Sequence, residues 1–380
     1  MIEFNRELKA LEKSLLTLAA VLLLARFVNL HYDTPLFFSH YGQSEITDPY
    51  MYTSFPRNAE LFDSWDPYHY ERWSSWRVSL SALAAYPAFL IAGVSRTAAN
   101  VSSVALQTLG LALFVLGWRR RRTAAEAAWL ALFLAASTLL FTTSRAPFLE
   151  NGLIFTSGAL FYLYARLGDV SWAPAACGAL IAIGAFSGKL VSLALCAPLV
   201  VDYFISGRRR AVQNLVGLCG GLTAVTVLYA ALFYDGFIAG MLAYYTEQLG
   251  SVGLAPMADK SPGNLLEALL SFGATGGMSR FEPFVIALAL VGAVLVVSRL
   301  LEGKSDERRA LRAPLFALVW LAAGALPLVP FEYRPYRYLE PLILPLAALA
   351  AVAVTALLAS DLRLSLRSRR RLAPALLSLG

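Results

Sequence analysis

Long apolar runs recur along this 380-residue chain, and they restrict its fold more than any other feature. A run of about 20 apolar residues can cross the hydrocarbon core of a bilayer as a helix. Within that core only helices and closed barrels satisfy every backbone polar group, and a barrel would show short segments of alternating hydrophobicity. The mean hydropathy of the chain, +0.60, is also above the usual range of soluble proteins. The sequence therefore predicts an all-α polytopic membrane protein.

About ten of the apolar runs are candidate transmembrane helices. They cover residues 12–30, 98–118, 124–143, 151–167, 173–187, 190–206, 212–234, 281–300, 312–330 and 338–360. The run 78–94, "VSLSALAAYPAFLIAGV", is ambiguous, because it contains Pro87 and Gly93.

Arginine and lysine lie in short blocks between the runs. These blocks account for most of the net charge of +7, so the charge does not indicate a nucleic-acid-binding protein. The blocks are Arg6/Lys9/Lys13, Arg119 to Arg122, Arg208 to Arg210, the stretch from Arg299 to Arg312, and the tail from Arg363 to Arg371. If 78–94 does not cross, every block falls on the cytoplasmic side, as the positive-inside bias favours. We therefore expect 78–94 to lie at the outer interface or to dip into the membrane and return, broken by Pro87 and Gly93, and both termini to be cytoplasmic.

No separate soluble domain is visible in the sequence. We expect one transmembrane module over 1–360 and a basic cytoplasmic tail over 361–380. The outer loop 31–97 would carry interfacial helices, and a second outer loop would cover 235–280.

With this orientation the unusual polar residues converge on the outer side. Asp48 lies in the first outer loop, and three later outer turns carry Arg145 and Glu150, then Lys189, then Glu332, Arg334, Arg337 and Glu340. A charge at bilayer depth costs about 2.5 kcal/mol or more unless it has a partner or water. Lysine snorkelling to the head groups remains an alternative for Lys189, but several ionic groups on one side favour a shared site.

Cations at the lipid boundary beside carboxylates suit a lipid-linked phosphate. Arg and Lys would hold the phosphate of a polyprenyl carrier as a leaving group, and a carboxylate would deprotonate or orient an acceptor. Glycosyl transfer from such a carrier is our hypothesis. The alternatives are an oligosaccharide ligase or polymerase using polyprenyl-diphosphate glycans, and a lipid or solute transporter. Transporters usually place polar groups near the midplane.

The same residues carry a family resemblance. "TDPYMYTSFPRNAELFDSWDP" resembles the first outer loop of GT-C integral-membrane glycosyltransferases, and is similar to that of protein O-mannosyltransferases and lipid A aminoarabinose transferases. "SRAPFLEN", "FSGKLVS" and "YRPYRYLEP" resemble later motifs of that family in the same order. The chain departs from the pattern at Asp48-Pro49, where the family usually has Asp-Glu, so one acid of the family's pair is missing and Glu45 is the candidate to replace it.

The resemblance implies a polyprenyl-phosphate sugar as donor, a glycan, lipid or protein as acceptor, and inverting transfer on the outer face of the cell (inner, cytoplasmic) membrane. It implies catalytic roles for Asp48 and Glu150, donor-phosphate binding by Lys189, Arg337 and Arg145, and positioning by Glu45, Arg57, Tyr244, Tyr245 and Arg334. Arg57 pairing with Glu60 or Asp63, and an aromatic belt role for Tyr244 and Tyr245, are the structural alternatives.

We expect no cofactor. His31, His40 and His69 lie in the first outer loop among aspartates, but no metal-ligand spacing appears. A divalent metal therefore stays open without being favoured. Cys177, Cys196 and Cys219 lie in apolar runs and are expected to be small buried hydrophobes.

Overall fold

The computed structural model describes residues 2–31, 48–66, 78–168, 170–251, 282–302, 305–326 and 336–359. For 2–8, 48–49, 208–209, 233–251, 305–309 and 336–338 it describes the backbone only. Every regular element in these ranges is a helix. In chain order they are α1 (Ile2–Ala25), α2 (Asp48–Met51), α3 (Ser54–Phe62), α4 (Leu80–Ala92), α5 (Arg96–Arg121), α6 (Ala124–Ala136), α7 (Thr138–Ser144), α8 (Leu149–Leu167), α9 (Ala173–Ser187), the 3-10 helix η3 (Leu190–Leu195), α10 (Cys196–Ile205), α11 (Arg208–Ser251), α14 (Pro283–Glu302), α15 (Ser305–Ala325), the 3-10 helix η5 (Tyr336–Leu342) and a final helix over 343–359.

Several of these helices suit a membrane span, which confirms the predicted class of an all-helical membrane protein. Within the described ranges, four are long and apolar enough: Arg96–Arg121, Arg210–Leu232, Pro283–Glu302 and Leu339–Ala359. The pair α6 and α7 would make a fifth span, bent by 58°. Shorter apolar helices occupy other predicted runs. The total of about ten spans stays a prediction.

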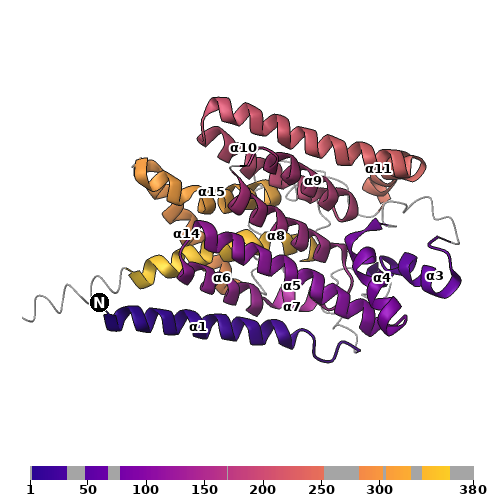
Figure 1. Cartoon of the computed structure of the whole chain (residues 1–380), viewed down its shortest axis with the longest axis horizontal. Helices are drawn as coiled ribbons and strands as arrows, with labels where there is room; N and C mark the ends of the chain where they lie inside the picture. Colours follow the sequence, from indigo (N-terminus) through magenta and orange to yellow (C-terminus); the bar gives the residue numbers. More distant parts are fainter. Residues whose placement is uncertain are drawn as a thin grey trace, which may run out of the picture.

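The long helices lie side by side, with α1 along one edge and α11 along the opposite edge (Figure 1). The final helix is central, since 67% of its apolar window is buried, against 6% for that of α11. The outer face of α11 accordingly exposes Val212, Val216 and Leu232, a surface suited to lipid. Cys177 is buried, Cys196 is half-buried and Cys219 on this helix is exposed, so the expectation that all three cysteines are buried holds only for Cys177. An apolar run in a lipid-facing helix need not be covered by protein.

Two glycines let α5 and α8 pack with their backbones in contact. A Cβ at Gly158 would lie 1.9 Å from the carbonyl oxygen of Gly110, and a Cβ at Gly110 would lie 2.5 Å from the Cα of Phe155. Small residues at such crossings drive helix association in membranes, where van der Waals packing replaces the hydrophobic effect.

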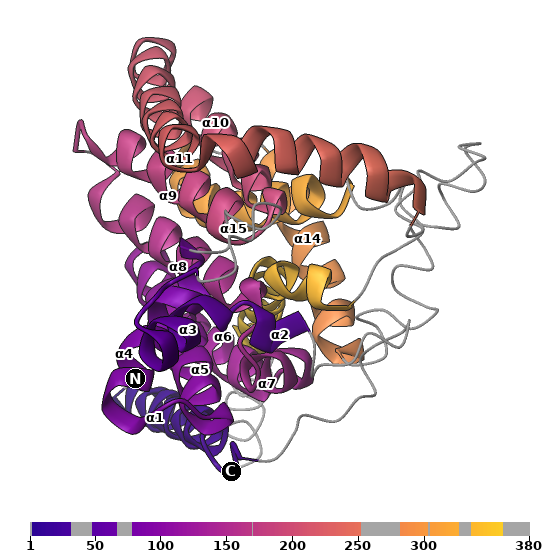
Figure 2. The same cartoon turned by 90° about the vertical axis from the view of Figure 1, so that its right-hand side faces the viewer.

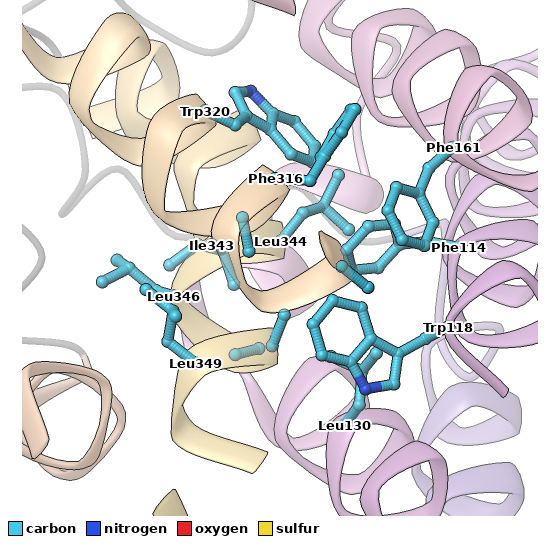
Figure 3. Close-up of a cluster of buried hydrophobic side chains, with 14 of the residues drawn as sticks. Phe114, Trp118, Leu130, Phe161, Phe316, Trp320, Ile343, Leu344, Leu346 and Leu349 are labelled. Atoms are coloured by element: carbon cyan, nitrogen blue, oxygen red, sulfur yellow. The ribbon is translucent and has the colours of Figure 1, made fainter. Parts of the chain in front are cut away.

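An aromatic core fills the space between α5, α8, α15 and the final helix (Figure 3). The rings of Phe114 and Phe161 lie 4.8 Å apart between centroids, and those of Phe161 and Phe316 lie 5.2 Å apart in an edge-on arrangement. Leu344 and Leu349 of the final helix pack into the same cluster. This core fixes α8, whose first turn carries Glu150, relative to η5.

The run 124–143 forms two helices because its backbone breaks at Ser137, and charged side chains stabilise both sides of the break. The guanidinium of Arg26 donates to the carbonyl oxygens of Leu134 (2.8 Å) and Ala135 (3.2 Å) at the end of α6. Glu282 accepts from the Ser137 hydroxyl (2.7 Å) and from the N–H of Leu139 (3.3 Å) at the start of α7. A cation at a helix C-terminus and an anion at a helix N-terminus match the helix dipoles.

The segment 78–94 differs in detail from the prediction. Pro87 lies inside α4 and does not end it. The helix ends at Gly93, whose φ of 74° is a conformation that glycine adopts without strain. The side chain of Ser79 caps the start by accepting from the N–H of Ala82.

Candidate functional site

Glu150 and Lys189 form an ion pair at one end of the bundle. The Nζ of Lys189 lies 3.2 Å from an Oε of Glu150, with the Glu150 side chain 1% exposed and that of Lys189 20% exposed. Glu150 stands in the first turn of α8, where the helix dipole favours an anion. Lys189 is the extended residue between α9 and η3, held by its N–H to the carbonyl of Gly184 (3.0 Å). Two outer turns predicted to share a site therefore meet.

A stripe of buried polar side chains on α5 joins this pair to the rest of the site. Asn100, Ser103 and Gln107 follow a spacing of three and four residues, which places them on one face of the helix. The side-chain amide of Gln107 donates to Oδ1 of Asn151 (2.8 Å) and to Oε1 of Glu340 (2.7 Å), and its Oε1 accepts from Arg26 (2.5 Å). Gln107 thus links the turn after α1 to α5, α8 and η5 at a single point.

The turn between α7 and α8 is fixed by the same stripe. The Nδ2 of Asn151 donates to the hydroxyl of Ser103 (2.7 Å) and to the carbonyl oxygens of Thr143 (3.1 Å) and Ala146 (2.9 Å). The Ser103 hydroxyl donates to the carbonyl of Ala146 (2.7 Å). Since Glu150 directly precedes Asn151, these bonds set the position of its carboxylate.

Helix α2, which begins at Asp48, is attached to the N-terminal end of this stripe. The Tyr50 hydroxyl donates to Oδ1 of Asn100 (3.2 Å), and Nδ2 of Asn100 donates to the carbonyl of Leu30 (2.9 Å). The guanidinium of Arg96 lies 5.6 Å from the centroid of the Tyr50 ring. Figure 2 looks onto this end of the molecule, where α2, α3, α4 and α7 are gathered. The backbone of Asp48 thus lies at the same end of α5 as the turn that carries Glu150, while its side chain lies outside the description.

Arg145 holds the chain that follows α1. Its guanidinium donates to the carbonyl oxygens of Arg26 (3.2 Å), Val28 (2.7 Å) and Asn29 (2.9 Å). Partial burial lowers the pKa of this guanidinium, although an arginine remains charged at neutral pH. Its predicted contact with a donor phosphate is not tested by these bonds.

The remaining predicted residues are placed less completely. Arg57 is exposed on α3 and donates to Oδ1 of Asn58 (2.9 Å). Arg337 lies on η5, which packs against α7 and α8, and Tyr244 and Tyr245 lie on α11; only their backbones are described. Glu45 and Arg334 lie outside the described residues. Their roles stay predictions.

The described part of the chain contains no group of three or more His, Cys, Asp and Glu side chains suited to a metal. His40 and His69 lie outside that part, so the metal question raised by the first outer loop stays open.

Four residues of this network were not assigned a role from the sequence: Arg26, Gln107, Asn151 and Glu340. Glu340 is wholly buried, and so are Arg26, Gln107 and Asn151. The signal that could have found Gln107 is the Asn100, Ser103 and Gln107 stripe inside an otherwise apolar span, because polar side chains within a span usually face the bundle interior.

Neither protein-family models nor curated proteins match this chain. Among solved structures, ArnT from Cupriavidus metallidurans bound to undecaprenyl phosphate is similar with a TM-score of 0.59 and 18% identity, covering 89% of this chain and 59% of that one. The apo state of the same protein gives 0.56 and 17% identity, with 91% and 60% covered. ArnT is a lipid A aminoarabinose transferase of the GT-C class. The chain therefore has the all-helical GT-C fold that its motifs resemble, over about three fifths of the length of ArnT.

Proposed function

We propose that this chain is a membrane glycosyltransferase that moves a sugar from a polyprenyl-phosphate donor to an acceptor on the outer side of the membrane. The observation that carries the proposal is the ion pair of Glu150 and Lys189 at the end of the bundle where α2, η5 and the 145–150 turn are also held. The fold shared with ArnT, which has been seen with undecaprenyl phosphate bound, supports the choice of carrier.

Lys189 is suited to hold the donor phosphate. Its side chain is 20% exposed whereas that of its partner Glu150 is 1% exposed, so of the two residues only the lysine can be reached by a ligand from outside the protein. A phosphate arriving from the lipid boundary would meet this ammonium group without having to enter the core. Arg337 on η5 would add a second cation, since η5 packs directly on α8.

The transfer itself is a displacement at the anomeric carbon. The acceptor oxygen or nitrogen forms a bond to that carbon from the face opposite the phosphate, and the bond from the carbon to the phosphate oxygen breaks. The electron pair leaves with the polyprenyl phosphate, whose developing charge Lys189 and Arg337 stabilise. Asp48 accepts or orients the acceptor proton. The anomeric configuration is therefore inverted.

Glu150 has a different role in this scheme. The Glu150 side chain is only 1% exposed, so its carboxylate is not placed to take a proton from an acceptor in solvent. It forms an ion pair with the lysine instead. We propose that Glu150 orients the side chain of Lys189. The hydrogen bonds of Gln107 and Asn151 fix the start of α8, which carries Glu150.

A transfer assay with the full chain in detergent or nanodiscs tests the proposal. A panel of polyprenyl-monophosphate sugars carrying a radiolabel is offered together with a mixed acceptor fraction, with and without chelator. We expect label to move from at least one donor, and Asp48→Asn to lower the rate at least about 100-fold, the lower range for a lost general base.

Asp63→Asn is the matched control for Asp48→Asn. Asp63 is exposed at the end of α3 with a φ of 52°, a left-handed conformation that asparagine also tolerates. Its substitution should leave transfer unchanged. Transfer only from diphosphate-linked glycans would instead support the ligase alternative, and a fully active Asp48→Asn would remove Asp48 from the mechanism.

A further inference from the structure

A cavity lies at the opposite end of the bundle from Glu150 and Lys189. It has a volume of about 170 Å³ and opens between the α5–α6 junction, α14, α15 and the final helix. In Figure 1 this end, with α14 and the end of the final helix, lies on the left, while α3 and α4 lie on the right. The cavity is therefore separate from the candidate transfer site.

The cavity lies at the level where lipid head groups are expected. Three of the helices long enough to span, Arg96–Arg121, Pro283–Glu302 and Leu339–Ala359, all end at this cavity with their C-terminal turns. The last turns of α5 and α14 carry arginines. Basic residues at the ends of spans lie in the head-group region.

One wall of the cavity is charged. Arg122 makes a two-pronged ion pair with Glu126, with both N···O distances 2.7 Å, and also donates to the carbonyl of Ala310 (2.6 Å). These bonds hold a guanidinium in the wall and neutralise it. Arg299 on α14 is exposed and makes no hydrogen bond or ion pair with any described residue. The side chains that line the cavity therefore carry a net charge of +1, because Glu126 balances Arg122 and leaves the charge of Arg299.

The other wall is apolar. Leu295 and Val296 of α14, Leu311 of α15, and Val352 and Ala356 of the final helix line it. A free inorganic anion would gain nothing from this wall. A singly charged phosphodiester that carries an acyl chain would match both walls, and the volume is below the roughly 300–1,000 Å³ typical of pockets that enclose a drug-sized ligand. It has room for part of a lipid rather than for a whole lipid.

We propose that this cavity binds the phosphodiester of an anionic phospholipid, with the phosphate at Arg299 and the start of one acyl chain against Leu295 and Val352. Its occupant would touch α14, the final helix and the α5–α6 junction at once, because all three contribute residues to the cavity wall.

Lipid binding to the full chain, measured by native mass spectrometry and thermal shift in detergent, tests this site. We expect phosphatidylglycerol to bind and to raise the melting temperature more than phosphatidylcholine does. Arg299→Gln should weaken phosphatidylglycerol binding roughly fivefold, the effect of one basic residue near an anionic surface. Ala356→Leu should also weaken it, because the added carbons fill the cavity and leave the charges intact.

Arg120→Gln is the control, since Arg120 is exposed at the same end of α5 but does not line the cavity. Equal losses in Arg120→Gln and Arg299→Gln would show unspecific attraction to basic residues and overturn the proposal. So would an equal thermal shift with inorganic phosphate, or unchanged binding in Ala356→Leu.

Discussion

Lys189 lies 3.2 Å from Glu150, and the acid of this pair is almost completely buried while the base is one-fifth exposed. Breaking a buried pair by removing one partner is costly, because a charge is left where water cannot reach it. The stability of the pair and its proposed role in transfer can therefore be separated by mutation.

Lys189→Met should lower the stability by about 3 kcal/mol, the low end of the range for a buried pair because the lysine is partly exposed. Adding Glu150→Gln should recover most of that loss, since the buried charge is removed as well. Melting temperatures in one detergent would measure both effects. Transfer should remain lost in the double variant, because the cation that holds the phosphate is still missing.

A double variant no more stable than Lys189→Met would show that the pair does not couple the two residues. Recovery of transfer in the double variant would show that Lys189 only compensates Glu150 and does not bind the donor.

A substitution of Gln107 should lower both the stability of the fold and the rate of transfer. Gln107→Leu removes hydrogen bonds to Arg26 and to Glu340, two buried ionisable groups, and each such bond contributes about 1.5–3 kcal/mol. We expect a loss of about 3 kcal/mol or more in thermal or denaturant unfolding, together with reduced transfer.

Thr108→Val is the control one residue along α5. The Thr108 hydroxyl is buried and has no hydrogen-bond partner among the residues that the structure describes, so its replacement by a methyl group should change stability little. A Gln107→Leu variant as stable as Thr108→Val would contradict the role assigned to the polar stripe.

Much of this architecture follows from the sequence. Apolar runs mark the helices, and motifs at turns of one predicted side point to Glu150 and Lys189, which do form a pair. The reason is local: a helix start after Phe148 and a Gly-Lys turn after α9 can be read from a few adjacent residues. Arginines of two basic blocks, at Arg122 and Arg299, likewise line one cavity.

The break at Ser137 could not be read in this way. A serine inside an apolar run is compatible with a continuous helix, and the groups that stabilise the break, Arg26 and Glu282, come from distant parts of the chain. For the same reason Glu340 gave no sign of its link to Gln107. Contacts between residues far apart in sequence depend on how the helices pack.

The close approach of α5 and α8 gives a steric prediction. Gly158→Ala places a methyl group against the backbone of Gly110, so the helices must separate, and we expect a loss of about 3 kcal/mol, the upper end of the usual range for overpacking. Gly220→Ala on α11 is the control, because nothing lies within 4 Å of the added Cβ. It should leave the melting temperature unchanged or slightly raised, since alanine favours a helix over glycine by about 1 kcal/mol. Equal effects of the two changes would mean that the α5–α8 contact is not tight.

Arg26 gives the last prediction, because its planar guanidinium spans two kinds of acceptor at once. One nitrogen bonds the Gln107 amide, and the other bonds the carbonyls of Leu134 and Ala135 at the break. A lysine keeps the charge but presents a compact ammonium that does not reproduce this fork. Stability should fall in the order wild type, Arg26→Lys, Arg26→Met, because methionine leaves the carbonyls and Glu340 without the cation. Hydrogen exchange should rise first in α7, where the break is stabilised. If Arg26→Met were as stable as the wild type, with α7 equally protected, the bend would be held by packing alone and the charge at Arg26 would not be needed for the fold.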